Sequence, residues 1–174
     1  MHVTTIQHDT PLGMMWSTWT DRGLYSLNWQ RPDSEVASGS TATTSPASTA
    51  QQIDNFRGQI DDFFRAGKES FRDVIIDDTG WTVFTAEVYR RCRTIPPAST
   101  MTYKQLAKLA GNEKASRAVG AAMSRNRILL VIPCHRVIAA GGGLRGFSAP
   151  GGLSTKRLLL QLEREGSLTQ QQLA

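Results

Sequence analysis

Residues 102–125, TYKQLAKLAGNEKASRAVGAAMSR, decide the fold of the second half of this 174-residue chain. We predict a short helix over residues 102–110, followed by Gly111-Asn112 as its C-cap and turn. A second helix is predicted over residues 114–125. A short helix, a glycine-containing turn and a second helix together make a helix-turn-helix pattern.

The second of these helices carries unusually small side chains. They are Ala115, Ser116, Ala118, Gly120, Ala121 and Ala122. Such a surface suits tight helix packing, and it would also let the helix enter a narrow DNA groove with Arg117 as the long side chain at its middle. Helices that read base sequence usually carry Arg, Asn and Gln, so this composition argues against sequence-specific reading.

Downstream lies an apolar run, Ile128 to Ile132, that we predict to be a buried strand ended by Pro133. Cys134, His135 and Arg136 follow without a gap. Beside an imidazole and a guanidinium, the pKa of a thiol can fall below its free value of about 8.5, which gives a nucleophilic thiolate. The alternative is an ordinary buried thiol, because free cysteine is among the most buried residue types.

The segment after the cysteine is rich in glycine. Residues 139–152 hold six glycines and a proline, so we expect their backbone to approach a ligand closely. They lack the Lys-Ser/Thr ending of a phosphate-binding P-loop. Ser154 or Thr155 is predicted to cap a final helix, which carries Glu163 near its end.

The first half of the chain reads as a small α/β unit. An amphipathic helix is predicted from Gln52 to Gly67, and Ser/Thr-rich residues 31–51 are predicted to be a flexible loop. Thr82 is predicted to start another helix. Strands are predicted over residues 2–8, 13–19 and 23–30, forming an antiparallel meander, and over residues 71–77.

Charge is distributed unevenly along the chain. Residues 1–89 hold 6 basic and 12 acidic residues, whereas residues 90–145 hold 11 basic residues and one acidic residue. This asymmetry favours a polyanionic partner such as nucleic acid, the alternative being a solvated basic face without a partner. We therefore place a domain boundary near Asp78-Thr79-Gly80, between an N-terminal domain of residues 1–79 and a C-terminal domain of residues 80–174.

The number of cysteines and the hydropathy of the chain indicate the cellular compartment in which the protein works. Cys92 and Cys134 are the only cysteines and form no CxxC motif, which fits a reducing cytosol. No apolar run approaches the roughly 20 residues of a membrane span, and the N-terminus lacks a secretory signal. We expect a cytoplasmic monomer without a membrane partner.

Residues 101–145 and 151–163 resemble the methylated-DNA–protein-cysteine methyltransferases, the DNA alkyltransferases that repair O6-alkylguanine. The pieces that carry the resemblance are Thr102 to Ala107, Arg117 to Met123, Asn126, Ile132 to Val137, and Gly151 to Leu153 with Lys156, Leu159 and Glu163. The likeness is strong over about residues 80–165 and weaker over residues 60–67. Over residues 1–50 it rests on order and size alone.

The resemblance implies the fold and the chemistry. The expected fold is α/β (α+β): a ribonuclease-H-like N-terminal domain with a three-stranded antiparallel sheet, and a mostly helical, winged-helix-like C-terminal domain. Cys134 would be the nucleophile and keep the alkyl group, activated by His135 through a water, while Glu163 orients His135. Tyr103 would protonate or hydrogen-bond the departing guanine, and Asn126 would tie the recognition helix to the active-site turn.

The same resemblance implies how alkylated double-stranded DNA is held. Arg117 would replace the flipped base in the stack. The expected DNA-binding residues are Arg117, Ser116, Ala118, Gly120, Ala121 and Arg125, and the expected base-pocket residues are Met123, Val137 and Gly151. Transfer would be irreversible, with each molecule acting once on O6-alkylguanine, and O4-alkylthymine is the second substrate that the resemblance leaves open. No cofactor or metal is expected, because no cysteine precedes Cys92 to form the zinc site that some members carry.

The sequence departs from the family pattern at two places, and two functions other than alkyl transfer are considered. Arg127 stands where the family usually has proline after Asn126, and the loop of residues 147–150 is about two residues longer than in some members. One rival is a non-catalytic relative that binds alkylated DNA and recruits other repair, although such relatives usually replace the cysteine. The other is a Cys-His hydrolase, which usually places its histidine far from the cysteine in sequence.

Overall fold

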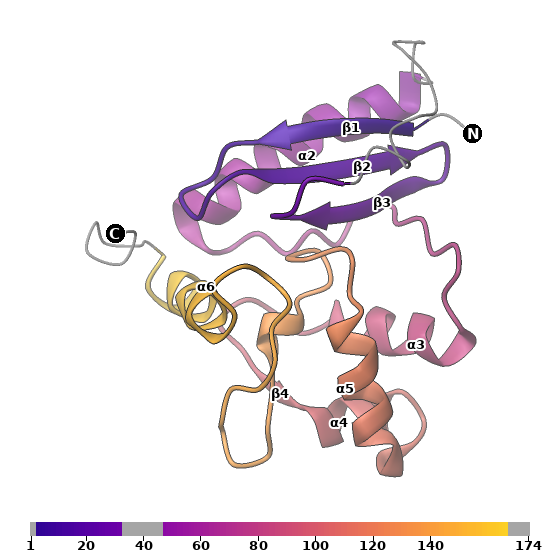
Figure 1. The fold of residues 1–174 in the computed structure, drawn as a ribbon, viewed down its shortest axis with the longest axis vertical. Helices are drawn as coiled ribbons and strands as arrows, with labels where there is room; N and C mark the ends of the chain where they lie inside the picture. The colour runs from indigo at the N-terminus through magenta and orange to yellow at the C-terminus, as the bar shows by residue number, and fades with distance from the viewer. Residues whose placement is uncertain (1–2, 33–46, 167–174) are drawn as a thin grey trace.

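The computed structural model describes residues 3–32 and 47–166. Its sheet and helix α2 (Ala47–Ala66) occupy one half of the molecule, and the remaining helices gather below the sheet in Figure 1. A three-stranded antiparallel sheet above a helical C-terminal half confirms the expected α/β fold class.

The N-terminal meander forms as predicted. Strands β1 (Val3–His8), β2 (Met15–Thr20) and β3 (Gly23–Asn28) pair in that order, and all neighbours are antiparallel. Helix α2 covers one face, where the Phe56 and Trp19 rings meet edge to face with centroids 5.3 Å apart. Burial of these aromatic side chains holds the helix to the sheet.

Two boundaries in this half differ from the prediction. Helix α2 begins at Ala47 and not at Gln52, so the predicted 31–51 loop is shorter; its residues 33–46 lie outside the described part of the chain. Residues 71–77 do not form a strand. Ile76 alone makes a parallel bridge to Leu24, because the side chain of Asp77 bonds Thr20 and the Thr79 backbone and turns the chain away.

The helix-turn-helix is confirmed. It consists of α4 (Tyr103–Leu109), a turn with a short 3₁₀ helix η1 (Glu113–Ala115), and α5 (Ser116–Ser124). Thr102 caps α4 through a capping box with Gln105, which satisfies backbone donors that a helix start leaves free. Helix α3 (Val83–Cys92) packs on both helices and is capped by Thr82, as predicted.

The apolar run before the cysteine is not a strand. All five residues from Ile128 to Ile132 are buried, but only Ile128 forms a β-bridge, with Leu27. The rest turn tightly, with Leu130 in the left-handed region at φ 67° and Ile132 N–H donating to Ile128 O over 3.0 Å. A short apolar run indicates burial but does not distinguish a strand from a buried turn, which explains why a strand was wrongly predicted here.

The remaining elements close the fold around that turn. They are β4 (Met101–Thr102), the 3₁₀ helix η2 (Cys134–Arg136), β5 (Val137–Ile138), which pairs with β4 in parallel, and α6 (Leu153–Glu165). Gly152, and not Ser154 or Thr155, occupies the N-cap of α6, where no side chain caps the helix. Within the described residues, no helix combines the length and the apolar character that a bilayer crossing needs.

Candidate functional site

The 3₁₀ helix η2 brings Cys134, His135 and Arg136 into one tight turn. Cys134 N–H donates to Ile132 O over 2.7 Å and Arg136 N–H donates to Pro133 O over 2.9 Å. The side chains are buried, with Cys134 4% exposed and His135 0% exposed. The cysteine therefore lies in the protein interior, and only a small part of its surface is accessible to solvent.

Asn126 shapes the turn that leads to the cysteine. Its Nδ2 donates to Ile132 O over 2.8 Å, and its Oδ1 accepts from Ile128 N–H over 2.9 Å. It lies two residues after the end of α5, so its amide joins that helix to the segment before Cys134. The hydrogen bonds are buried, where losing a partner costs most.

The carboxylate of Glu163 forms hydrogen bonds with three residues, two of which belong to the cysteine turn. Glu163 of α6 places Oε1 2.7 Å from His135 Nε2 and accepts from Arg136 Nε over 2.9 Å, while Oε2 accepts from Ala98 N–H over 3.1 Å. With Nε2 donating to the carboxylate, His135 presents an unprotonated Nδ1. That atom is buried and has no hydrogen-bond partner among the described residues, so it is a base able to accept a proton.

Burial governs the protonation of these groups and favours the buried-thiol alternative for the resting cysteine. It raises the pKa of the Cys134 thiol, although Asn126 and Lys156 oppose the rise, so the resting group is a thiol. Burial lowers the pKa of His135, which stays neutral despite Glu163. Burial alone would raise the pKa of Glu163, but His135 and Arg136 outweigh it and hold it below its ordinary value. The proton must therefore leave Cys134 during the reaction, not before it.

A buried lysine is the residue for which the sequence analysis gave no role. Lys156 is 0% exposed and its Nζ donates to Val137 O over 2.7 Å and to Arg145 O over 3.1 Å. It shares the inward stripe of α6 with Leu159 and Glu163 at helical spacing, and that spacing was the available signal. Its two bonds fasten the glycine-rich loop to β5.

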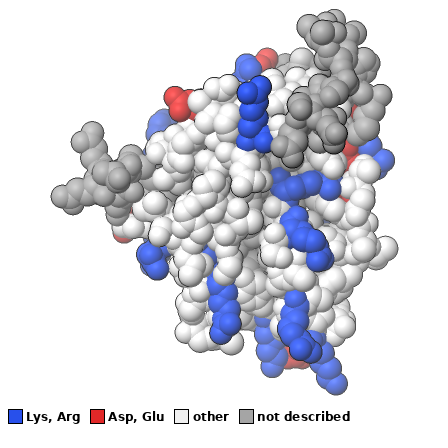
Figure 2. Space-filling model, viewed as in Figure 1, with Lys and Arg blue, Asp and Glu red and all other residues white. Residues whose placement is uncertain are grey.

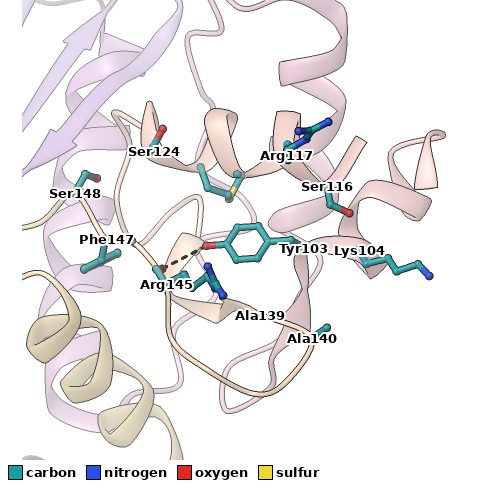
Figure 3. A pocket seen from close by; sticks show the side chains of 13 residues that line it. Tyr103, Lys104, Ser116, Arg117, Ser124, Ala139, Ala140, Arg145, Phe147 and Ser148 are labelled. Atoms are coloured by element: carbon teal, nitrogen blue, oxygen red, sulfur yellow. Dashed lines mark hydrogen bonds between the residues drawn. The ribbon is translucent and has the colours of Figure 1, made fainter. Parts of the chain in front are cut away.

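A cavity of about 670 Å³ opens between α4, α5 and the loop of residues 139–148. Figure 3 shows the Tyr103 ring extending across it, with the hydroxyl donating to Arg145 O over 3.4 Å. Burial and the neighbouring Cys134 raise the pKa of Tyr103, which keeps its hydroxyl a proton donor. The lining residues are Tyr103, Lys104, Ser116, Arg117, Gly120, Met123, Ser124, Ala139, Ala140, Arg145, Gly146, Phe147 and Ser148.

The cavity collects some of the predicted residues and leaves others outside. The cavity is lined by the predicted catalytic residue Tyr103, the predicted base-pocket residue Met123, and three predicted DNA-binding residues, Ser116, Arg117 and Gly120. Nine predicted residues are absent from the lining, the cysteine itself among them: Cys134, His135, Asn126, Glu163, Val137, Gly151, Ala118, Ala121 and Arg125. Val137 is buried beside the cysteine, whereas Gly151 lies before α6 at φ 80°, where a Cβ would meet Thr155 Oγ1 at 2.5 Å.

The surface around the cavity is basic. Figure 2 shows Lys and Arg side chains spread over the helical half, with few acidic side chains among them. Arg117 and Arg125 are exposed at the two ends of α5, and neither forms an ion pair with any residue that the structure describes. Their charges are therefore available to a polyanion.

Comparison with known proteins decides the family. A family model for the 6-O-methylguanine DNA methyltransferase DNA-binding domain matches residues 83–165. The methylated-DNA–protein-cysteine methyltransferase of Methanosarcina acetivorans is 36% identical over 158 residues, covering 89% of this chain and 94% of the relative. The chain belongs to the methylated-DNA–protein-cysteine methyltransferase family. Membership confirms the expected enzyme class, a methyltransferase of direct-reversal DNA repair.

Other members of the family agree. The methyltransferase of Mycolicibacterium paratuberculosis is 36% identical, covering 91% of each chain. A crystal structure of Mycobacterium tuberculosis OGT in complex with DNA superposes with a TM-score of 0.75 at 32% identity, covering 99% of each chain. The helix-turn-helix and the cavity beside it thus lie within the matched DNA-binding region.

Proposed function

We propose that this methyltransferase removes the alkyl group from O6 of guanine in double-stranded DNA and keeps it on Cys134. The observation that carries the proposal is the buried pair of His135, which directly follows Cys134 in the chain, and Glu163, together with the cavity crossed by Tyr103. A volume of about 670 Å³ lies within the usual range of about 300–1,000 Å³ for small-ligand pockets. It can therefore accept one base extruded from the stack.

The chemistry follows from the protonation states. His135 Nδ1 takes the proton of Cys134 through a water as sulfur attacks the alkyl carbon, and Glu163 stabilises the resulting imidazolium. An S–C bond forms, the C–O6 bond breaks, and the guanine takes up a proton with the Tyr103 hydroxyl as donor. Afterwards Tyr103 regains a proton from solvent and the His135 imidazolium releases one to solvent, so that both return to their resting states. The thioether is stable to water, so each molecule acts once.

The surface of α5 is proposed to hold the duplex. Ser116, Ala118, Gly120 and Ala121 let it approach a minor groove about 6 Å wide, Arg117 fills the vacated stack, and Arg125 meets a phosphate. Met123, Val137 and Gly151 complete the base pocket. We propose that residues 80–174 carry these functions and that the enzyme works as a cytoplasmic monomer.

Intact-protein mass spectrometry tests transfer against binding alone. The protein is mixed with excess duplex carrying O6-methylguanine, and its mass should rise by one CH₂ unit and no further. Cys134→Ala should bind the duplex and keep its mass. Binding by the wild type without any gain in mass would refute transfer and favour the non-catalytic alternative.

A further inference from the structure

Arg127 joins the active-site half of the molecule to the sheet. Its Nε donates to Tyr25 O over 2.7 Å, and its Nη2 donates to Asp77 O over 2.9 Å and to Thr79 O over 3.0 Å. The guanidinium carbon lies 3.9 Å from the centroid of the Tyr25 ring and 5.2 Å from that of Trp81. One side chain thus holds β3 and the segment that leads into α3.

The backbone at the same place docks on the same strand. Leu27 N–H donates to Arg127 O over 2.8 Å, and Leu129 N–H donates to Leu27 O over 3.0 Å. Residues 127–129 therefore run beside β3, and the side chain of Arg127 locks that alignment. A planar guanidinium with several donors suits such multiple contacts better than an ammonium does.

This attachment lies next to the groups that shape the site. Asn126, whose amide sets the turn before Cys134, is the preceding residue. On the other side, Trp81 packs edge to face on Tyr89 with centroids 4.7 Å apart, and the Tyr89 hydroxyl donates to Ala122 O of α5 over 2.7 Å. The contacts of Arg127 thus reach both the cysteine turn and the helix that lines the cavity.

We propose that Arg127 is a positioning residue for alkyl transfer: by anchoring on Tyr25 and on the segment 77–81, it fixes Asn126 and hence the Cys134 turn. The N-terminal sheet acts on the reaction through this side chain. This inference rests on the proposed transfer to Cys134. The competing role is a phosphate contact, which would affect DNA binding and leave the chemistry at the cysteine unchanged.

Arg93 provides a matched control. Its Nη2 donates to the backbone oxygens of Phe71, Arg72 and Val74 over 2.7, 3.0 and 2.9 Å, so it also ties the helical half to the N-terminal half through one guanidinium. It stands at the C-cap of α3, away from Asn126 in the chain. Because its side chain bonds only oxygens of residues 71, 72 and 74, loss of Arg93 removes a similar attachment without breaking a hydrogen bond of Asn126 or of residues 134–136.

The test measures transfer from free O6-benzylguanine, which needs no DNA, in single-turnover reactions well below each variant's melting temperature. Arg127→Ala should slow it by about tenfold or more, because small misplacements of reacting groups are costly, whereas Arg93→Ala should stay within about twofold of wild type. The pH–rate profile of Arg127→Ala should also move to higher pH, because the Asn126 hydrogen bond that lowers the pKa of Cys134 is displaced. Arg127→Lys, which keeps the charge and restores one donor, should recover part of the rate and serves if Arg127→Ala does not fold.

Three results would overturn the inference. They are an Arg127→Ala rate within about twofold of wild type, an equal loss in Arg93→Ala, and a loss confined to DNA substrates, which would mark a phosphate contact. A wild-type protein that never takes up the benzyl group would instead refute the proposed function, so the two failures are distinguishable.

Discussion

Replacing Glu163 with glutamine is the most severe test of the buried contacts that Glu163 makes with His135 and Arg136. The carboxylate carries the negative charge that faces Arg136, with Oε1 2.8 Å from Nη2, and it also accepts from His135 and from Ala98 N–H. Glutamine keeps the shape and one acceptor but places an NH₂ group against donors and leaves the guanidinium unneutralised. Both partners are buried, so solvent cannot compensate.

The size of the effect follows from that geometry. Removing one partner of a buried ion pair costs about 3–5 kcal/mol, and the retained amide oxygen points to the lower end, about 3 kcal/mol. In a chain of this length, 1 kcal/mol shifts Tm by about 2–4 °C, which gives a fall of roughly 6–12 °C. Transfer should slow by about 10²-fold, because His135 loses the partner that fixes its tautomer and stabilises its charge.

The pH dependence has a definite sign. Because the pKa of Glu163 lies below its ordinary value of about 4.3, its stabilisation is complete at neutral pH and is lost as pH falls through the acid range. Glu163→Gln should therefore differ most from wild type at neutral pH and least in acid.

Thermal unfolding and single-turnover transfer to O6-benzylguanine measure the two effects. The matched control is Glu165→Gln, because Glu165 is exposed at the end of the same helix and contacts Gln161. It should change Tm by no more than about 1 °C, as surface substitutions usually do. If Glu163→Gln behaves like the control in both assays, the contacts of Glu163 with His135 and Arg136 have no role in either stability or transfer.

Three further predictions follow from particular contacts. Burial, and to a smaller extent the Arg57 charge, lowers the pKa of His8 to about 4, so protonation of His8 in the unfolded chain should reduce the free energy of unfolding by about 2 kcal/mol between pH 7 and pH 5. His8→Gln, which can keep the hydrogen bond to Ser17, should make the free energy of unfolding from urea titrations depend less on pH. The same pH dependence in His8→Gln and wild type would contradict this prediction. Arg117→Ala should slow repair of duplex DNA far more than attack on free O6-benzylguanine, and equal losses on both would remove its role in filling the stack. Affinity for duplex DNA should fall steeply with added salt, whereas a flat response in a fluorescence titration would contradict phosphate binding by the basic half.

Much of the fold was predictable from local signals. Gly13 lies in the connection after β1 and Gly23 begins β3 directly after the next turn, both at positive φ, and these two breaks delimit the strands of the meander. The capping box from Thr102 to Gln105 and Gly111 at φ 89° similarly mark the ends of α4. These features depend on neighbouring residues, which is why the sequence sufficed.

The two segments wrongly predicted as strands are short runs rich in apolar residues. All five residues from 128 to 132 are buried, and burial on every side hides the periodicity that distinguishes strands from turns, whereas residues 71–77 mix buried side chains with the exposed Ile75 and form only a single bridge to β3. The sequence also left the protonation of Cys134 open between a thiolate and a buried thiol. Neighbouring charges can be read from the sequence, but the burial that outweighs them comes from tertiary packing.

The site was predictable in part. Cys134, His135, Asn126, Tyr103 and Glu163 are distant in sequence except for the first two, and their resemblance to family motifs brought them together where spacing alone could not. The contacts of Arg127 had no such precedent, since its partners Tyr25 and Asp77 lie about 100 and 50 residues away. Long-range contacts to backbone oxygens leave no sequence signal.

Peptide mapping after reaction with O6-benzylguanine tests the central claim most directly. The protein contains two cysteines, and burial raises the pKa of Cys92 well above its ordinary value, so Cys92 should not react. The account predicts a benzyl group on the peptide that contains Cys134, with undiminished labelling in Cys92→Ser. Labelling of Cys92, or labelling that persists in Cys134→Ala, would contradict it.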